Sequence, residues 1–348
     1  MNESKRIYSL DTIKSIAAFL VVSLHVPSLP IPLIPRFIPD IARVAVPLFL
    51  MISGYFIYST DIDKLFEKTK IGIYRILKLL GVGFVVYLIV YIITFRDWLG
   101  VTKELSYLLS FKFWFFGQVP FCPIAWYLVA YLYSLMIYAF LRKIKASDIT
   151  FFCLAFVCIF IWLSTGSYQS FFFTETIPWM YNTSWIMAFP FFILGIYMKI
   201  YETRILNFKI TNILYYTLIF IFVLLSFAEY FLIGKINSVS VNGTAYISTV
   251  FLVFFIFSFA QSNKKFGAGT ILNTIGREYS LYIYLYHVAI NYLLCSFFIV
   301  HFSFINRFSF EPIIRLPFNY RFLINNFSVF LLSTIISYLL YRKSVSKN

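Results

Sequence analysis

Three ionisable side chains interrupt an apolar stretch near the start of the chain: Asp11, Lys14 and His25, within LDTIKSIAAFLVVSLHV at residues 10–26. On a helix, Lys14 and His25 share one face and lie about 16 Å apart along the axis. Imidazole titrates near neutral pH and can act as a general base. Two alternatives stay open: His25 as a hydrogen-bond partner between helices, and Lys14 as a residue that pairs with Asp11 or reaches the membrane surface.

A second apolar stretch, ARVAVPLFLMISGYFI, contains Arg43 and Ser53. By residue count, Arg43 lies about as deep from the outer face as His25. An arginine at that depth needs a carboxylate, carbonyl groups or an anionic substrate. Ser53 is a candidate nucleophile, but the sequence fixes no base beside it, so a role in packing or hydrogen bonding is favoured.

Later segments add a second histidine and several aromatic residues. In GREYSLYIYLYHV, Tyr284 and His287 fall on one helical stripe that is polar enough to face a cavity. Trp126 and Tyr127 open another apolar segment, and an aromatic belt at the membrane interface is the alternative explanation for them.

Residues 64–78 form the densest basic cluster, which we predict to be a cytoplasmic loop. Lys70, Arg75 and Lys78 in this loop would make charge-assisted contacts with a phosphate-rich cytosolic molecule. Simple anchoring of the loop on the inner membrane face is the alternative.

Such residues need a scaffold, and the composition indicates a polytopic membrane protein. The 348 residues are 61% hydrophobic and 12% charged, with a mean hydropathy of +0.84. We expect an all-α bundle of about ten membrane-spanning helices in a single domain, residues 1–348. The predicted spans are 10–28, 38–58, 76–95, 124–141, 149–164, 185–200, 210–232, 245–260, 279–300 and 322–341.

The basic residues predict the orientation of this bundle. With both termini in the cytoplasm, 19 of the 29 Lys and Arg residues fall in inside segments and 8 in outside segments. The net charge of +15 therefore reflects membrane topology and does not indicate nucleic-acid binding. The four cysteines lack metal or disulfide spacing, so we expect buried free thiols and no metal site.

These segments together resemble acyltransferase family 3, integral membrane enzymes that move acyl groups onto cell-surface glycans and related acceptors. The resemblance is carried by LDTIKSIAAFLVVSLH, RVAVPLFLMISGYF, YRILK, AWYL, FPFFILG and GREYSLYIYLYH, in the family's order. It implies that His25 is the catalytic histidine, that His287 is the second histidine of the late helix, and that Lys14 and Arg75 bind the acyl donor. The family usually has arginine at the position of Lys14.

The RVAVP…SGY form is also similar to the membrane portions of serine/alanine racemases, where a pyridoxal-dependent domain follows. Its absence here indicates either a stand-alone enzyme or a chain cut after the last span.

We therefore expect a cell-membrane acyltransferase that uses cytosolic acyl-CoA, most simply acetyl-CoA. The acceptor would be a hydroxyl or amino group of a cell-envelope glycan, a peptidoglycan precursor or an amino-acid-type molecule. His25, His287 and Arg43 would be catalytic, and Lys14, Lys70, Arg75 and Lys78 would bind the donor. Asp11, Ser53, Trp126, Tyr127 and Tyr284 would line the site. The alternative is a transport domain for a polar solute such as serine, the membrane part of a racemase.

Overall fold

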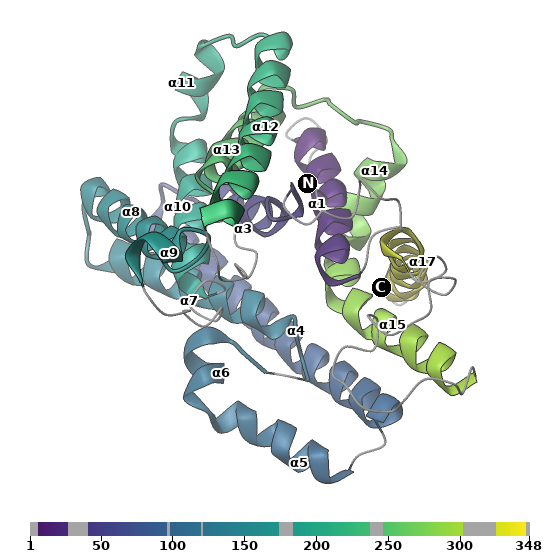
Figure 1. The fold of residues 1–348 in the computed structure, drawn as a ribbon. Coiled ribbons are helices and arrows are strands. Elements are labelled where there is room, and N and C mark those ends of the chain that lie inside the picture. The colour runs from purple at the N-terminus through teal and green to yellow at the C-terminus, as the bar shows by residue number, and fades with distance from the viewer. Residues whose placement is uncertain are drawn as a thin grey trace.

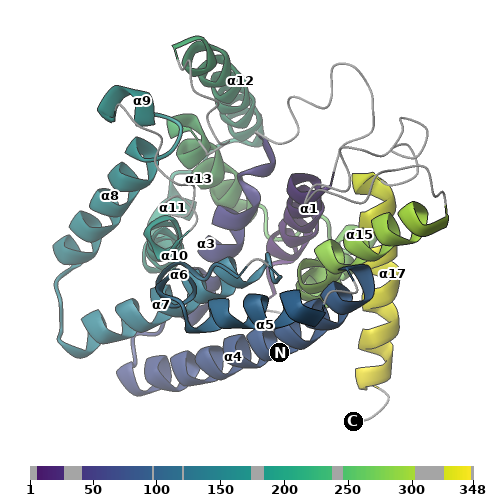
Figure 2. The same cartoon turned by 60° about the horizontal axis from the view of Figure 1, so that its bottom comes forward.

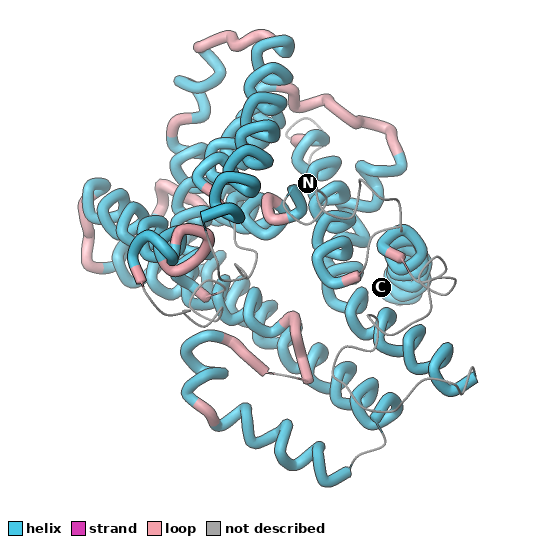
Figure 3. Tube along the Cα trace, in the orientation of Figure 1, coloured by secondary structure: helices cyan, strands magenta, loops and turns pink. Residues whose placement is uncertain are grey.

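The computed structural model describes residues 6–26, 41–95, 98–119, 121–173, 184–236, 246–301 and 325–345, and it contains no strand within them (Figure 3). Each of the ten predicted spans overlaps one of the longer helices. These are α1 (Tyr8–His25), α3 (Ala45–Ile57), α4 (Ile62–Phe95), α7 (Ala125–Lys143), α8 (Asp148–Ser164), α10 (Trp185–Ile200), α12 (Asn212–Ile236), α13 (Ile247–Ser262), α15 (Ser280–His301) and α17 (Asn326–Val345).

Shorter helical elements connect them. They are α5 (Trp98–Ser106), η2 (Tyr107–Leu109), α6 (Phe111–Phe116), α9 (Gln169–Phe172), α11 (Glu202–Asn207), α14 (Ile271–Thr274) and the π-helical turn η4 (Ile275–Tyr279). Three helical stretches among the described residues are long and apolar enough to cross a membrane: Ile62–Thr94, Ala125–Lys143 and Asn212–Ile233. The described part of the chain is therefore all-helical, and its long apolar helices are those of a membrane protein, while the count of about ten crossings and the orientation remain predictions.

Among the helix boundaries that differ from the sequence prediction, two lie close to predicted site residues. The basic cluster predicted as a loop is helical, because α4 begins at Ile62 and continues through it. The Asp61 side chain accepts the backbone N–H groups of Asp63 and Lys64 at 3.0 and 3.3 Å, which satisfies donors at the start of that helix. α1 ends at His25, and Val26 is extended, as expected for a residue that precedes proline.

Six helices pack in a closed ring. In order around it they are α1, α3, α10, α7, α4 and α15, each in contact with the next, and α15 returns to α1 (Figures 1 and 2). α8 packs outside against α10, α12 pairs with α13, and α17 covers α15 and α1. The inner faces of the six helices can therefore bring together side chains that lie far apart in the sequence.

Two glycines allow the closest helix pair in this ring. A Cβ atom on Gly54 of α3 would meet the carbonyl oxygen of Phe192, and one on Gly195 of α10 would meet that of Met51. The backbones of α3 and α10 thus touch directly, an arrangement that small residues favour in membrane helix packing. This contact fixes the position of Ser53, the neighbour of Gly54.

Candidate functional site

His25 and His287 form a pair at one end of α1. Their ring centroids lie 5.1 Å apart, and the rings are tilted by 53°. His25 is an exposed residue, whereas His287 on α15 is completely buried. An accessible imidazole can exchange a proton with a substrate, and a buried imidazole beside it can hold it in place.

The buried ring has a defined tautomer. Nδ1 of His287 lies 2.8 Å from the carbonyl oxygen of Tyr284 and 3.1 Å from that of Ile283. Since a carbonyl oxygen can only accept a hydrogen bond, Nδ1 carries the proton and Nε2 presents a lone pair. Among the described residues, Nε2 has no hydrogen-bond partner.

Tyrosines extend from this pair into the ring of helices. The ring of Tyr284 lies 6.1 Å from that of His287 and 5.0 Å from that of Tyr127 on α7. The hydroxyl of Tyr284 donates to the carbonyl of Ile124 at 2.7 Å, which fixes α15 against the start of α7. Tyr131, one turn along α7, stacks on Tyr127 with centroids 6.4 Å apart.

Ser53 and Arg75 join this aromatic series. Ser53 lies near Tyr127 and Tyr131, and its hydroxyl donates to the Phe49 carbonyl at 2.8 Å. Arg75 on α4 is close enough to Tyr131 for an electrostatic interaction. Ring contacts thus run from the histidine pair to Tyr131, and Ser53 of α3 and Arg75 of α4 lie near the far end of this series.

The other predicted lining residues lie at its edges. Trp126 is half-buried, with its ring centroid 6.3 Å from that of Tyr127. Asp11 lies near the opposite end of α1 from His25, and its carboxylate binds Arg6 at 2.7 Å and Lys14 at 3.2 Å. The ion-pair alternative for Lys14 is thus observed as a contact.

Lys14 also contacts α3. Its Nζ lies 5.7 Å from the ring centroid of Phe56, in the last turn of that helix. Arg43 lies in the turn before α3 and is half-buried. Arg43 and Phe56 thus lie at opposite ends of α3, as His25 and Lys14 lie towards opposite ends of α1.

Lys70, Arg75 and Lys78 are all exposed on α4. At 100° per residue, Arg75 and Lys78 are about 60° apart around the helix, whereas Lys70 is about 140° from Arg75. The three predicted donor-binding residues therefore do not share one face. Lys68, which the sequence analysis did not select, lies on the same face as Arg75.

Lys199 of α10 was also missed by the sequence analysis. Its Nζ lies 4.8 Å from the ring centroid of Tyr55 and 2.6 Å from the carboxylate of Glu202. Glu202 also binds Lys264 at 2.8 Å. The pair of Lys199 and Glu202 is three residues apart and could have been predicted from spacing, whereas the contacts with Tyr55 and Lys264 join residues far apart in the sequence and appear only in the packed structure.

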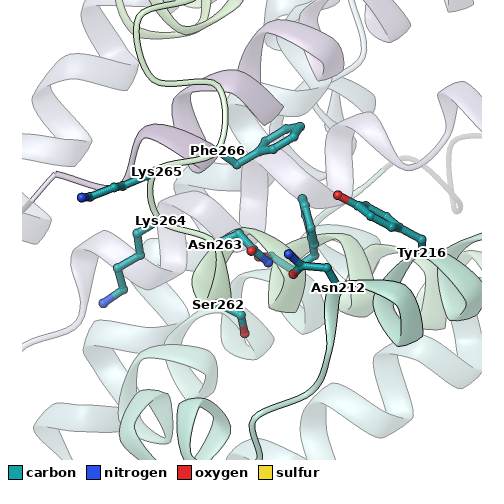
Figure 4. A pocket seen from close by; sticks show the side chains of 8 residues that line it. Asn212, Tyr216, Ser262, Asn263, Lys264, Lys265 and Phe266 are labelled. Atoms are coloured by element: carbon teal, nitrogen blue, oxygen red, sulfur yellow. The ribbon is translucent and has the colours of Figure 1, made fainter.

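A surface depression of about 340 Å³ lies elsewhere, between α12 and the C-terminal end of α13 (Figure 4). It is lined by Asn212, Tyr216, Phe259, Ser262, Asn263, Lys264, Lys265 and Phe266. None of the predicted site residues is among them, so we assign it no part in the chemistry. No group of His, Cys, Asp and Glu suited to a metal ion occurs in the part of the chain that the structure describes.

Comparison with known proteins gave one match. The family model for acyltransferase family 3, described as an acyltransferase domain, matches residues 7–342. No curated protein and no solved structure matches the chain. The match covers nearly the whole chain and gives no support to the transport alternative.

Proposed function

The chain belongs to acyltransferase family 3, and on this basis we propose that it transfers an acyl group from cytosolic acyl-CoA to a cell-envelope acceptor. The simplest donor is acetyl-CoA, and the acceptor is a hydroxyl or amino group of a glycan, a peptidoglycan precursor or an amino-acid-type molecule. The observation that carries the proposal is the histidine pair, in which accessible His25 lies beside buried His287.

The tautomer of His287 suggests a different role for each of the two imidazole rings. In this mechanism Nε2 of His287, which has no hydrogen-bond partner among the described residues, would accept the single N–H of neutral His25, because its own Nδ1 proton is committed to backbone carbonyls. The other ring nitrogen of His25 then presents its lone pair to the acceptor. His287 thus acts on the reaction through His25, as a positioning residue.

The reaction proceeds by attack of the acceptor on the thioester. His25 removes the proton as the acceptor oxygen or nitrogen forms a bond to the carbonyl carbon, whose oxygen becomes negatively charged. Arg43 stabilises this oxyanion. When the carbon–sulfur bond breaks, the thiolate takes the proton from His25, so the products are the acylated acceptor and free coenzyme A.

The donor approaches from the cytoplasmic side in this proposal. Lys14 and Arg75, with Lys70 and Lys78, attract its phosphates. The pantetheine arm follows the interior of the helix ring past Tyr131, Tyr127 and Tyr284. The length of that arm suits the separation of about 16 Å between Lys14 and His25 along α1.

Acyl transfer in membranes that contain the His25→Ala variant tests the mechanism. With radiolabelled acetyl-CoA and envelope acceptors, we expect transfer to fall by at least about 100-fold, the lower range for loss of a general base. Equal amounts of folded protein must be present in both membranes. Wild-type transfer by this variant would contradict the role of His25, and transfer that needs no acyl-CoA would contradict the donor.

A further inference from the structure

Phe56 is a partly exposed residue in contact with two lysines, one near its ring and one at its backbone carbonyl. It is 46% exposed, in the last turn of α3. Nζ of Lys14 lies 5.7 Å from its ring centroid, and Nζ of Lys68 lies 3.2 Å from its backbone oxygen. One ammonium group near the ring and another at the backbone of the same residue place Phe56 in a polar setting, where hydrocarbon chains of the bilayer are disfavoured.

Resting on the function proposed above, we propose that Phe56 is the stacking platform for the adenine of acyl-CoA and that Lys68, with Lys14, binds its phosphates. A flat aromatic surface with cations close by fits a nucleotide, whose base stacks while its phosphates accept charge-assisted hydrogen bonds. The Phe56 site is defined here as Phe56, Lys14 and Lys68.

Both lysines retain hydrogen-bonding capacity for a phosphate. Lys68 Nζ donates to the carbonyls of Phe56 and Tyr58 at 3.2 and 3.1 Å, and an ammonium has three donors. Lys14 Nζ lies 3.2 Å from Asp11 Oδ1. The Asp11 carboxylate is itself shared with Arg6, so this end of α1 keeps a net positive charge.

The position of the Phe56 site relative to the other candidate residues also fits the donor. Lys68 and Arg75 are seven residues apart on α4, so they share a face and lie about 10 Å apart along it. Arg75 lies within electrostatic range of Tyr131, where the tyrosine series towards the histidines begins. A nucleotide stacked on Phe56 would therefore direct its pantetheine arm along Arg75 into the helix ring.

Lys68 also has a structural role that an experiment must separate from ligand binding. Its bonds to the last carbonyls of α3 satisfy acceptors at a helix C-terminus. A loss of stability in a Lys68 variant is therefore expected whether or not a nucleotide binds. Phe56 makes the cleaner test, since its ring can be changed without removing a hydrogen bond.

The test measures binding of coenzyme A and of pantetheine, which lacks the nucleotide, to the full chain in lipid nanodiscs. Phe56→Leu is expected to weaken coenzyme A binding by about tenfold or more, the effect typical of a lost base-stacking contact. Pantetheine binding is expected to stay unchanged, and Phe56→Trp is expected to restore coenzyme A binding. Lys68→Gln should weaken coenzyme A and adenosine 3′,5′-bisphosphate binding in parallel.

Phe140→Leu and Lys64→Gln are matched controls. Phe140 is an exposed phenylalanine near the end of α7, and Lys64 is an exposed lysine one turn before Lys68. Both variants should bind coenzyme A like the wild type. The proposal is overturned if Phe56→Leu binds coenzyme A normally, or loses coenzyme A and pantetheine equally. If the wild-type chain binds no coenzyme A, the proposed donor itself is wrong.

Discussion

His287 depends on the backbone of its own helix for its proposed role. The carbonyls of Ile283 and Tyr284 fix the proton on Nδ1, and complete burial keeps water away from the ring. The polar stripe in the sequence suggests a cavity-facing histidine but not its tautomer. That information requires the distances to particular carbonyl oxygens.

Replacing His287 by Asn tests this arrangement at the residue scale. The Asn amide nitrogen can replace the Nδ1 donor, so the hydrogen bond to the helix backbone is retained while the Nε2 lone pair is lost. We expect a folded protein whose acyl transfer falls by about 100-fold, through kcat more than through KM for the donor. His287→Gln, with an acceptor oxygen near the position of Nε2, should recover part of the activity. Normal kcat in His287→Asn would contradict the proposed hydrogen bond to His25.

Glu202 gives a prediction on pH dependence outside the membrane-spanning helices. Burial raises the pKa of its carboxyl group, but the hydrogen bonds and charges of Lys199 and Lys264 more than offset this, so the pKa lies below the ordinary value of 4.5. A lowered folded-state pKa means that the charged form stabilises the fold. This stabilisation is fully present above pH 4.5 and is lost as the pH falls through the lower folded-state value.

Glu202→Gln should therefore lower the free energy of unfolding at neutral pH by about 1 kcal/mol, because both lysine partners are partly exposed. The difference in Tm between wild type and variant should shrink below pH 4.5. Thermal unfolding in detergent across this pH range measures it. Glu67→Gln on the exposed surface of α4 is the control and should show little change at any pH. A Tm difference that is constant with pH would contradict the ion-pair explanation.

At the scale of helices, the contact between α3 and α10 should be the least tolerant of added volume. A methyl group on Gly54 would collide with the backbone at Phe192, which cannot move without displacing α10. Gly54→Ala should destabilise the protein by about 1–3 kcal/mol, as for overpacked cores. It should also reduce acyl transfer, because α3 carries Ser53 and Phe56. Thermal unfolding and transfer assays on the same preparation measure both effects.

Gly81→Ala is the matched control for that prediction. Gly81 lies within α4, and a Cβ atom there would meet nothing within 4 Å. Removing glycine from a helix favours the helix by up to about 1 kcal/mol, so this variant should be as stable as the wild type or slightly more stable. Equal destabilisation by both alanines would show that the α3–α10 contact is not specially constrained.

The sequence predicted that each apolar segment forms a helix, but it did not predict every helix boundary. Residues 64–78 were expected to be a loop because lysines lower the hydropathy there. In the structure α4 continues through them, since lysine and arginine are good helix formers and their charged ends can stay in water. The end of α1 at His25 could have been predicted more closely, because Pro27 disfavours helix at Val26.

The candidate site was only partly predictable. The spacing of Tyr284 and His287 predicted that they lie on one face of a helix, and in the structure their rings are in contact. Contacts between different helices could not be predicted from spacing. Tyr127 and Tyr284 are in contact although 157 residues separate them, and Lys68 contacts Phe56 across the turn between α3 and α4. Such contacts depend on how the six helices close into a ring, which local periodicity does not specify.

At the scale of the whole molecule, the charge distribution predicts which side each end of the bundle faces. Lys14, Lys68, Lys199 and Lys264 lie in or beside segments that we predict to be cytoplasmic, where positive charge is favoured. The same side must admit acyl-CoA in the proposed function. Orientation and donor entry are therefore linked, and a topology measurement bears on both.

Reporter fusions to the full chain test this orientation. Green fluorescent protein after Asn348 should fluoresce, because the C-terminus is predicted to lie in the cytoplasm, and alkaline phosphatase at that position should be inactive. Alkaline phosphatase inserted after Ser110, within the predicted outer segment 96–123, should be active. The reverse pattern would place the basic half of α4 outside the cell, away from cytosolic acyl-CoA, and would contradict the proposed donor path. If both reporters indicate the same side, the chain must cross the membrane an even number of times between Ser110 and Asn348, and the prediction of an odd number would be wrong. The chemistry proposed for His25 and His287 would be unaffected.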